Sequence, residues 1–459
     1  MTQVDQTVIV SATRHDVIRK SFSRRRIERT LDENTTGVTM TDFPSAFNDH
    51  NHHSSSGSVS LALSDEGFLL RSTLYYDWGA VLDRCGLLAE LFSTSVRDRD
   101  EELHRRLKSQ GRRQLTATDQ WNNGVLHAAC FNRAPLEVIH AILDVASAAE
   151  PPVCLTQLRH SDESTPLLVA CAMGSVPSVI QALLQHDSVL SNSLPKVLGI
   201  ARAPDTLGST PLTELCNHYQ RLDRRNRRSL PPLELVDLVL NNNQDFSRDF
   251  QHFWSNVAAI VRAGWRRDNN ESMPSLLHGC CHMAESCPPA LTDLICRNYP
   301  HMISSTDRNG VLPIHLAVRG TFHPSQTLRY RQAYMIRRLC DSYPQACTEK
   351  IHGGRSVFCT AIASGLSWSE EHSPDQTTTT GPLQRIWKCV PDAIDIPDQE
   401  TGLFPFLLAA TVAGDPSWDE KEKETASARC VDNVFGLLRI FPQVVNDLTV
   451  VNDDWVHFE

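Results

Sequence analysis

The sequence contains no apolar run long enough to cross a lipid bilayer, which takes about 18 uncharged apolar residues. The longest candidate, residues 403–413, is shorter and contains Pro405. The N-terminal residues also lack the apolar core of a secretory signal, because Asp5, His15 and Asp16 interrupt them. We therefore expect no membrane partner, and a cytoplasmic or nuclear protein.

Motifs that build common active sites are missing as well. The chain has no GxxxxGK[ST] or GxGxxG phosphate loop, no GxSxG nucleophile turn and no HExxH metal helix. The best metal candidate is residues 278–282 (His-Gly-Cys-Cys-His) with Cys287. Zinc normally needs two well-spaced ligand pairs, however, and this segment offers none. We expect no enzyme, no cofactor, no metal site and no small-molecule substrate.

Charge is uneven along the chain. The formal net charge is −10, and residues 391–459 alone contain 14 acidic and 4 basic residues. An acidic segment of this kind repels the phosphates of nucleic acid. We therefore do not expect nucleic acid as a general partner.

The chain contains one short pattern seven times. Each copy begins with a large apolar residue, and in six copies the fourth residue is small. The copies begin at Leu126, Leu167, Leu212, Leu277, Ile314, Phe358 and Phe406. The intervals between them are tens of residues long, which is typical of stacked helical repeats.

The clearest copy lies in residues 307–317. Asn309-Gly310 predicts a tight turn, because both residues tolerate positive φ. Pro313 then suits the first position of a helix. After each copy comes a second apolar segment, and the clearest of these begin at Pro135, Pro177, Pro232 and Pro289. The repeating unit is therefore predicted to be turn, helix, loop and helix.

Three of these turns carry a resemblance to a known family. The segments that begin with Thr165-Pro166, Thr210-Pro211 and Leu312-Pro313 resemble the Thr-Pro-Leu-His signature of ankyrin repeats. Residues 77–85, 277–289 and 401–410 resemble a divergent, long-repeat ankyrin-like family found in unicellular algae. The resemblance implies an interaction module without catalytic residues. It also implies that His127, His278 and His315 form hydrogen bonds to the backbone of a neighbouring repeat.

The predicted fold is all-α, an ankyrin-like helical repeat solenoid of about seven helix-pair repeats with a disordered N-terminal arm. Residues 1–66 are expected to form the disordered polar arm, because they have too little apolar surface to offset the entropy of ordering. Residues 67–118 are expected to form capping helices, residues 119–446 the repeat array, and residues 447–459 a polar tail. Such a stack predicts a non-catalytic scaffold that binds a protein partner through its surface.

Insertions within the repeats supply the candidate binding residues. We expect them to form one exposed edge, which is basic in the middle and carries tryptophans toward the C-terminus. The candidates are Arg221, Arg224, Arg225, Arg227, Arg228, Trp368 and Trp418. A solvated insertion is the alternative for the arginines.

The arm holds a short basic patch around residues 19–26. It suggests phosphorylation at Ser21 or a nuclear-localisation signal, and a plain solvated tail is the alternative. An alternative function follows, in which a nuclear regulatory factor uses its basic segments to bind nucleic acid or a DNA-associated partner.

Overall fold

The computed structural model describes residues 67–93, 101–191, 199–226, 248–268, 273–319, 325–350, 355–369, 380–412 and 420–443. These ranges contain 18 α-helices and no strand, so the expected all-α class is confirmed for them. The chain divides into two units, and the first (Met1–Ser64 with His372–Thr377) lies outside the described residues. The predicted disordered arm also lies outside them. None of the described helices has the length and hydropathy of a bilayer-spanning segment.

Three helices precede the predicted array: α3 (Phe68–Leu74), α4 (Trp78–Ser93) and α5 (Glu101–Thr116). Helix α3 packs on α6, and α4 packs on α7. The guanidinium of Arg84 lies 4.2 Å from the centre of the Phe68 ring, which fastens α4 to α3. The expected helices of this segment are therefore present.

All seven copies of the apolar pattern form helices. They are α6 (Val125–Phe131), α8 (Pro166–Met173), α10 (Pro211–Asn226), α13 (Leu276–His282), α16 (Pro313–Val318), α18 (Val357–Ala363) and α20 (Pro405–Thr411). The fourth position is buried in every copy, from Ala129 to Ala409. The first position is buried in six copies, whereas Phe406 in the last copy is only half-buried.

Hydroxyl caps explain why several of these helices begin where they do. The side chains of Thr165, Ser275 and Ser356 each accept an N–H of the first helical turn. Such a cap provides a partner for an N–H group that has none within the helix. Pro occupies the first turn of α8, α16 and α20, where its missing N–H costs nothing.

Six second helices follow the predicted pattern: α7 (Leu136–Ala148), α9 (Pro177–Ser191), α14 (Pro289–Asn298), α17 (Gln326–Ser342), α19 (Pro382–Cys389) and α21 (Glu420–Ile440). The second helix predicted at residues 232–240 lies outside the described residues. Helix α12 (Arg248–Asp268) lies between the third and fourth copies and packs on α9, α10 and α13. Its Phe253 stacks on Tyr219 of α10 at 4.5 Å between ring centres. The long interval between the third and fourth copies therefore contains a helix that packs its apolar side chains against neighbouring helices.

An aromatic residue followed by proline ends three of the second helices. Helices α14, α17 and α21 end directly before Tyr299-Pro300, Tyr343-Pro344 and Phe441-Pro442. The first two pairs open the short helices α15 (Pro300–Ile303) and η3 (Pro344–Cys347), and Pro391 opens η4 (Pro391–Ile394) in the same way. Proline keeps the preceding residue out of the α-helical region, so the chain must turn there.

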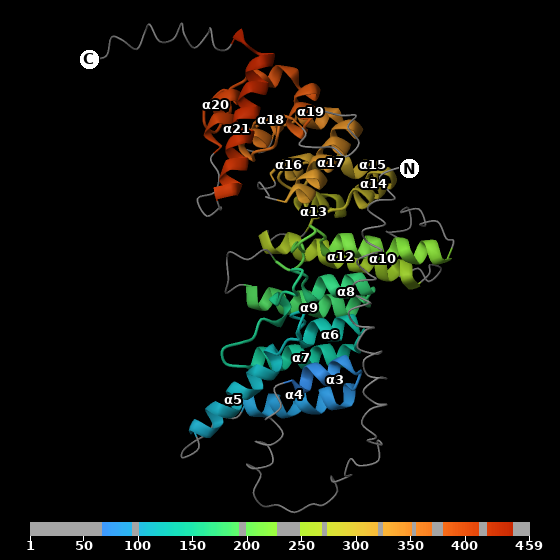
Figure 1. The fold of residues 1–459 in the computed structure, drawn as a ribbon. Helices are drawn as coiled ribbons and strands as arrows, with labels where there is room; N and C mark the ends of the chain where they lie inside the picture. The colour runs from blue at the N-terminus through green and yellow to red at the C-terminus, as the bar shows by residue number, and fades with distance from the viewer. Residues whose placement is uncertain are drawn as a thin grey trace, which may run out of the picture. The chain divides into compact units, whose positions relative to one another are not determined.

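Neighbouring helices in the chain also pack on one another (Figure 1). Along the first helices, α6 contacts α8, α8 contacts α10, α13 contacts α16, α16 contacts α18 and α18 contacts α20. Along the second helices, α7 contacts α9, α14 contacts α17 and α17 contacts α19. Each helix pair therefore buries its apolar face mainly against the pairs before and after it.

Candidate functional site

Five turns between helix pairs share one hydrogen-bonding geometry. In each turn the N–H of the first residue donates to the carbonyl of the last, and the residue before the last has a positive φ. The turns are residues 119–123, 160–164, 205–209, 307–311 and 398–403. The turn predicted at Asn309-Gly310 is confirmed, because Gly310 has a φ of 74° and its N–H donates to the Asp307 carbonyl at 3.1 Å.

An aspartate at the start holds four of these turns together. Oδ1 of Asp205 accepts the N–H groups of Leu207 and Ser209, each at 2.8 Å. Asp307 does the same within its own turn, at 2.8 and 2.7 Å. This side-chain turn is a local preference of Asp. Sequence analysis recognised one such turn through its Asn-Gly pair and missed the others. These turns could have been found from an Asp followed three or four residues later by Asn or Gly.

The second turn starts with His160 in place of Asp. Its Nδ1 lies 2.8 Å from Oδ1 of Asp162 and 3.2 Å from Oγ of Ser161. Burial alone would raise the pKa of Asp162, but hydrogen bonds from His160 and Ser164 lower it below its ordinary value. A catalytic triad needs the Ser and the Asp on opposite ring nitrogens, whereas here both meet the same one. The group therefore stabilises the turn and does not form a nucleophilic relay.

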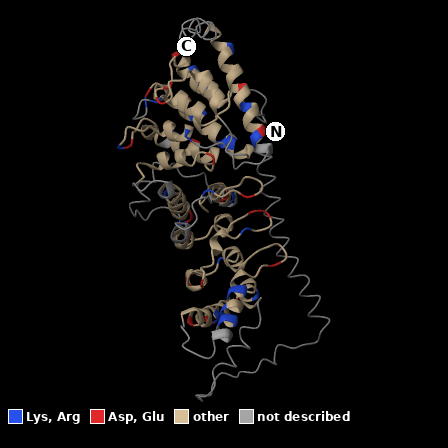
Figure 2. Ribbon diagram, turned by 90° about the vertical axis from the view of Figure 1, so that its left-hand side faces the viewer, with Lys and Arg blue, Asp and Glu red and all other residues tan. Residues whose placement is uncertain are grey.

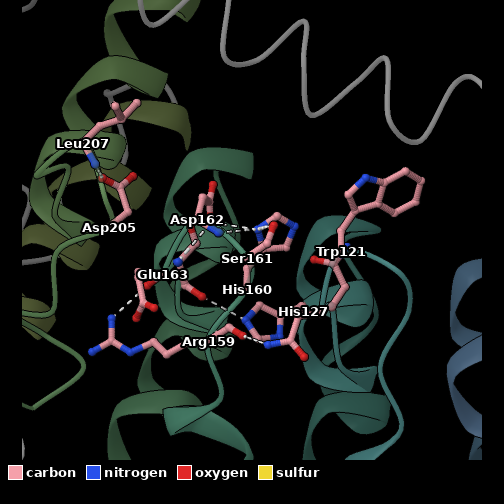
Figure 3. A network of polar contacts seen from close by, with 12 residues as sticks. Trp121, His127, Arg159, His160, Ser161, Asp162, Glu163, Asp205 and Leu207 are labelled. Atoms are coloured by element: carbon pink, nitrogen blue, oxygen red, sulfur yellow. Dashed lines mark hydrogen bonds and ion pairs between the residues drawn. The ribbon is translucent and has the colours of Figure 1, made fainter.

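Backbone hydrogen bonds join the first three turns. The N–H of Ser161 donates to the Trp121 carbonyl at 3.1 Å, and the N–H of Thr206 donates to the Asp162 carbonyl at 3.0 Å. We call the three turns (residues 119–123, 160–164 and 205–209) the turn row. Figure 3 shows these residues together, with Trp121 and Leu207 at its two ends.

The side chain of Arg159 reinforces the turn row from below. Its Nη1 donates to the Glu163 carbonyl at 2.8 Å and to the Pro204 carbonyl at 3.2 Å (Figure 3). The Arg159 carbonyl in turn accepts the side-chain amide of Asn122 at 2.7 Å. Arg159 therefore contacts the first two turns and the residue directly before the third.

Three first helices, α6, α13 and α16, each carry a buried histidine that connects the helix to the next turn or loop. Nε2 of His127 donates to the Ser164 carbonyl at 3.1 Å, and Nδ1 accepts the Gly124 N–H at 3.4 Å. The Nε2 atoms of His278 and His315 lie 3.2 and 3.3 Å from the carbonyls of Val311 and Glu349. Burial lowers the pKa of all three imidazoles, which favours the neutral form. Each histidine therefore forms the expected hydrogen bond to a backbone carbonyl more than 30 residues further along the chain.

Side chains at the tips of the turn row face solvent. Leu207 is 54% exposed, and Gln120, Ser161, Glu163 and Thr206 are exposed too. Trp121 is half-buried. The row therefore presents an apolar end, a polar middle and an aromatic ring on a fixed backbone.

Of the five arginines predicted to form the basic edge, only Arg221 has a side chain among the described residues. Arg221 is half-buried on α10, and its Nη2 donates to the Ala172 carbonyl of α8 at 3.2 Å. The side chains of Arg224, Arg225, Arg227, Arg228 and Trp418 lie outside the described residues, as does Ser21. Their roles stay predictions.

Trp368 was expected on the exposed edge, and that placement is wrong. Only 7% of its surface is exposed, and its ring lies 5.9 Å from that of Trp387. The backbone N–H of Trp368 donates to Oδ1 of Asn433 on α21 at 2.7 Å. Trp368 lies against α21 because burial of its large apolar ring is favourable.

The metal candidate of the sequence is engaged in other contacts. Both ring nitrogens of His278 have hydrogen-bond partners, and the His282 ring lies edge-on to Trp265 at 5.2 Å. Another set of possible ligands does converge among the described residues: the thiols of Cys340, Cys347 and Cys389, all within 4.8 Å of one another. Sequence analysis missed this group, because its members come from three separate elements.

Neither a protein-family model nor a curated protein sequence matches the chain.

Proposed function

We propose that the chain is an ankyrin-like helical repeat solenoid of about seven helix pairs, and that it acts as a non-catalytic scaffold for a protein partner. The observation that carries the proposal is the turn row, in which three successive turns are joined through backbone atoms and expose their tips. The serial packing of helix pairs supports the solenoid.

A surface held in place by its own backbone suits binding. A partner that docks on the turn row does not have to order a flexible loop, and this lowers the entropic cost of association. The tip side chains can therefore contribute most of their contact energy to affinity.

The exposed chemistry of the row favours a protein partner. Leu207 and the ring of Trp121 supply apolar contact, and aromatic residues are enriched where interfaces bind most tightly. Glu163 and the Ser161 hydroxyl supply charge and hydrogen bonding between them. The row fits a segment that places an apolar side chain beside basic or polar groups.

The test is affinity capture with the tagged full chain, combined with cross-linking and mass spectrometry. The binding variant is Leu207→Glu, which changes a tip residue that is more than half exposed. The matched control is Phe435→Glu on α21, another exposed apolar side chain far along the chain. Partners lost with the first variant and retained with the second support the proposal. Partners that bind both variants equally, with cross-links elsewhere, contradict it.

A second candidate is the nuclear regulatory factor, and one observation favours contact with an anionic partner. Helix α5 carries Arg105, Arg106, Lys108, Arg112 and Arg113, and Figure 2 shows blue basic positions gathered on this helix. Charge of this kind attracts phosphates or acidic protein segments. Binding to duplex DNA that weakens steeply with added salt would support this candidate, whereas no binding at low salt would exclude it.

A further inference from the structure

Three thiols meet between α17, η3 and α19. Cys340 lies in the last turns of α17, Cys347 closes η3 and Cys389 closes α19. The Tyr343-Pro344 pair turns the chain so that Cys347 comes back beside Cys340, with 3.7 Å between the two sulfur atoms. The packing of α19 against α17 and η3 then brings in Cys389. We call these residues the three-thiol cluster.

The spacing of the sulfurs matches a metal site. A zinc–sulfur bond of about 2.3 Å places two thiolates on one tetrahedral ion about 3.8 Å apart. The sulfurs of Cys340 and Cys347 are 3.7 Å apart, and all three lie within 4.8 Å. A metal ion would therefore need only small side-chain shifts to be bound by all three.

Free cysteine also packs as a small apolar side chain, so thiols can meet in a core without binding a metal. Cys340 and Cys347 are each about 1% exposed, but Cys389 is only half-buried. That partial exposure gives an ion a path to the cluster. Among the described residues, this is the one group of three or more potential ligands whose binding atoms converge this closely.

A positive charge lies beside the cluster, close to its half-buried member Cys389. The guanidinium of Arg385 is hydrogen-bonded to Asp341 and acts electrostatically on Cys389 and Cys340. The neighbouring thiols and burial raise the pKa of Cys340 and Cys347, so an ion that binds these two residues has to displace their protons.

We propose that Cys340, Cys347 and Cys389 bind one thiophilic metal ion with a filled d shell, Zn²⁺ or Cu⁺, and so fasten two successive helix pairs together. Soft thiolate ligands select these two ions. Binding breaks the remaining S–H bonds, forms three sulfur–metal bonds and releases the protons to solvent. Three thiolates complete a trigonal Cu⁺ site, whereas Zn²⁺ takes a water as its fourth ligand. The inference does not depend on the proposed binding function.

The experiment uses the purified full chain, reduced and freed of metal by dialysis against a chelator. Zn²⁺ is titrated in competition with a chromophoric chelator, and Cu⁺ is titrated without oxygen against bicinchoninate. Co²⁺ is added separately, because its charge-transfer absorbance reports the number of bound thiolates. The expected result is one ion per chain with three thiolates and a higher melting temperature in the presence of the ion. The ion that binds one per chain and gives the larger rise in melting temperature is assigned to the site.

Two variants decide the location of the site. Cys389→Ser replaces the half-buried ligand and should weaken binding by more than the about 10- to 100-fold typical of losing an outer-shell partner. Cys296→Ser is the matched control, because Cys296 is buried in the last turns of α14, one helix pair earlier. It should leave the affinity unchanged. Circular dichroism of both variants is the control for correct folding.

Three outcomes would overturn the proposal. The first is no stoichiometric binding of either ion to the reduced chain. The second is binding that survives Cys389→Ser or is lost equally in Cys296→Ser. The third is a stable Cys340–Cys347 disulfide, found by mass spectrometry, together with reduced protein that takes up no metal.

Discussion

Acid should weaken the fold through His127, and the size of the effect follows from its burial. Burial lowers the pKa of His127 to about 4 in the folded chain, whereas an unfolded histidine has a pKa of about 6.5. Between these values the unfolded chain binds more protons, so the free energy of unfolding rises with pH. It falls as the pH drops from about 6.5 toward about 4. From pH 7.5 to pH 5, we expect His127 alone to account for a loss of about 2 kcal/mol.

The structural reason lies in the two ring nitrogens. Nε2 donates to the Ser164 carbonyl while Nδ1 accepts the Gly124 N–H. A protonated ring cannot accept that N–H, and its charge would be almost completely buried. Protonation therefore breaks the hydrogen bond at the start of α6 and leaves a buried charge, whereas Nε2 still donates to the Ser164 carbonyl.

The assay is urea denaturation followed by circular dichroism at pH 5, 6 and 7.5. Wild type is compared with His127→Gln, and the difference between their pH dependences isolates this one group from the other histidines. His140→Gln on the exposed face of α7 is the control and should behave as wild type. If wild type and His127→Gln lose stability in parallel, the imidazole of His127 is not the titrating group and the reasoning is refuted.

The remaining predictions concern packing, an ion pair and a turn. Ala317→Asp buries an unpaired charge, so it should abolish the cooperative transition or lower the free energy of unfolding by about 4 kcal/mol. Ala410→Asp changes an exposed residue and should have little effect; equal melting temperatures of the two variants would show that the helix register is wrong. Arg355→Ala should cost about 3 kcal/mol in urea denaturation, because it removes the two hydrogen bonds, at 2.9 and 2.7 Å, to the buried carboxylate of Asp398; full stability in the variant would contradict this. Gly310→Ala should cost only about 1 kcal/mol, since its φ is 74° but nothing lies within 4 Å of the added methyl group; a loss several times larger would mean that the turn is packed more tightly than described.

Local chemistry made much of the fold predictable. The pattern of a large residue followed three positions later by a small one is a property of a single helix turn, and it placed all seven first helices. Tyr343-Pro344 ends a helix through steric exclusion alone, so its effect can be predicted without neighbours. Asn309-Gly310 likewise fixes its turn through its own backbone preferences.

Contacts between distant segments were not predictable in the same way. Trp368 stands in a polar insertion, and only the return of α21 beside it explains its burial. The three-thiol cluster joins residues from two helix pairs, so no local spacing announces it. The turn row could not be predicted from glycine positions, because Asn122 and Glu163 take the positive φ that glycine usually takes. Hydrogen bonds within each turn hold these two residues in that conformation.

Two hydrogen bonds between main-chain atoms join the three turns of the turn row, and this separates the shape of the row from the chemistry of its tips. Exchange of Ser161, Glu163, Thr206 or Leu207 leaves the amide and carbonyl groups that join the turns in place. The tips can therefore diversify in evolution, or be randomised in a library, while the scaffold beneath them is inherited unchanged. A chain built in this way can change its partner through a few surface substitutions without having to fold anew.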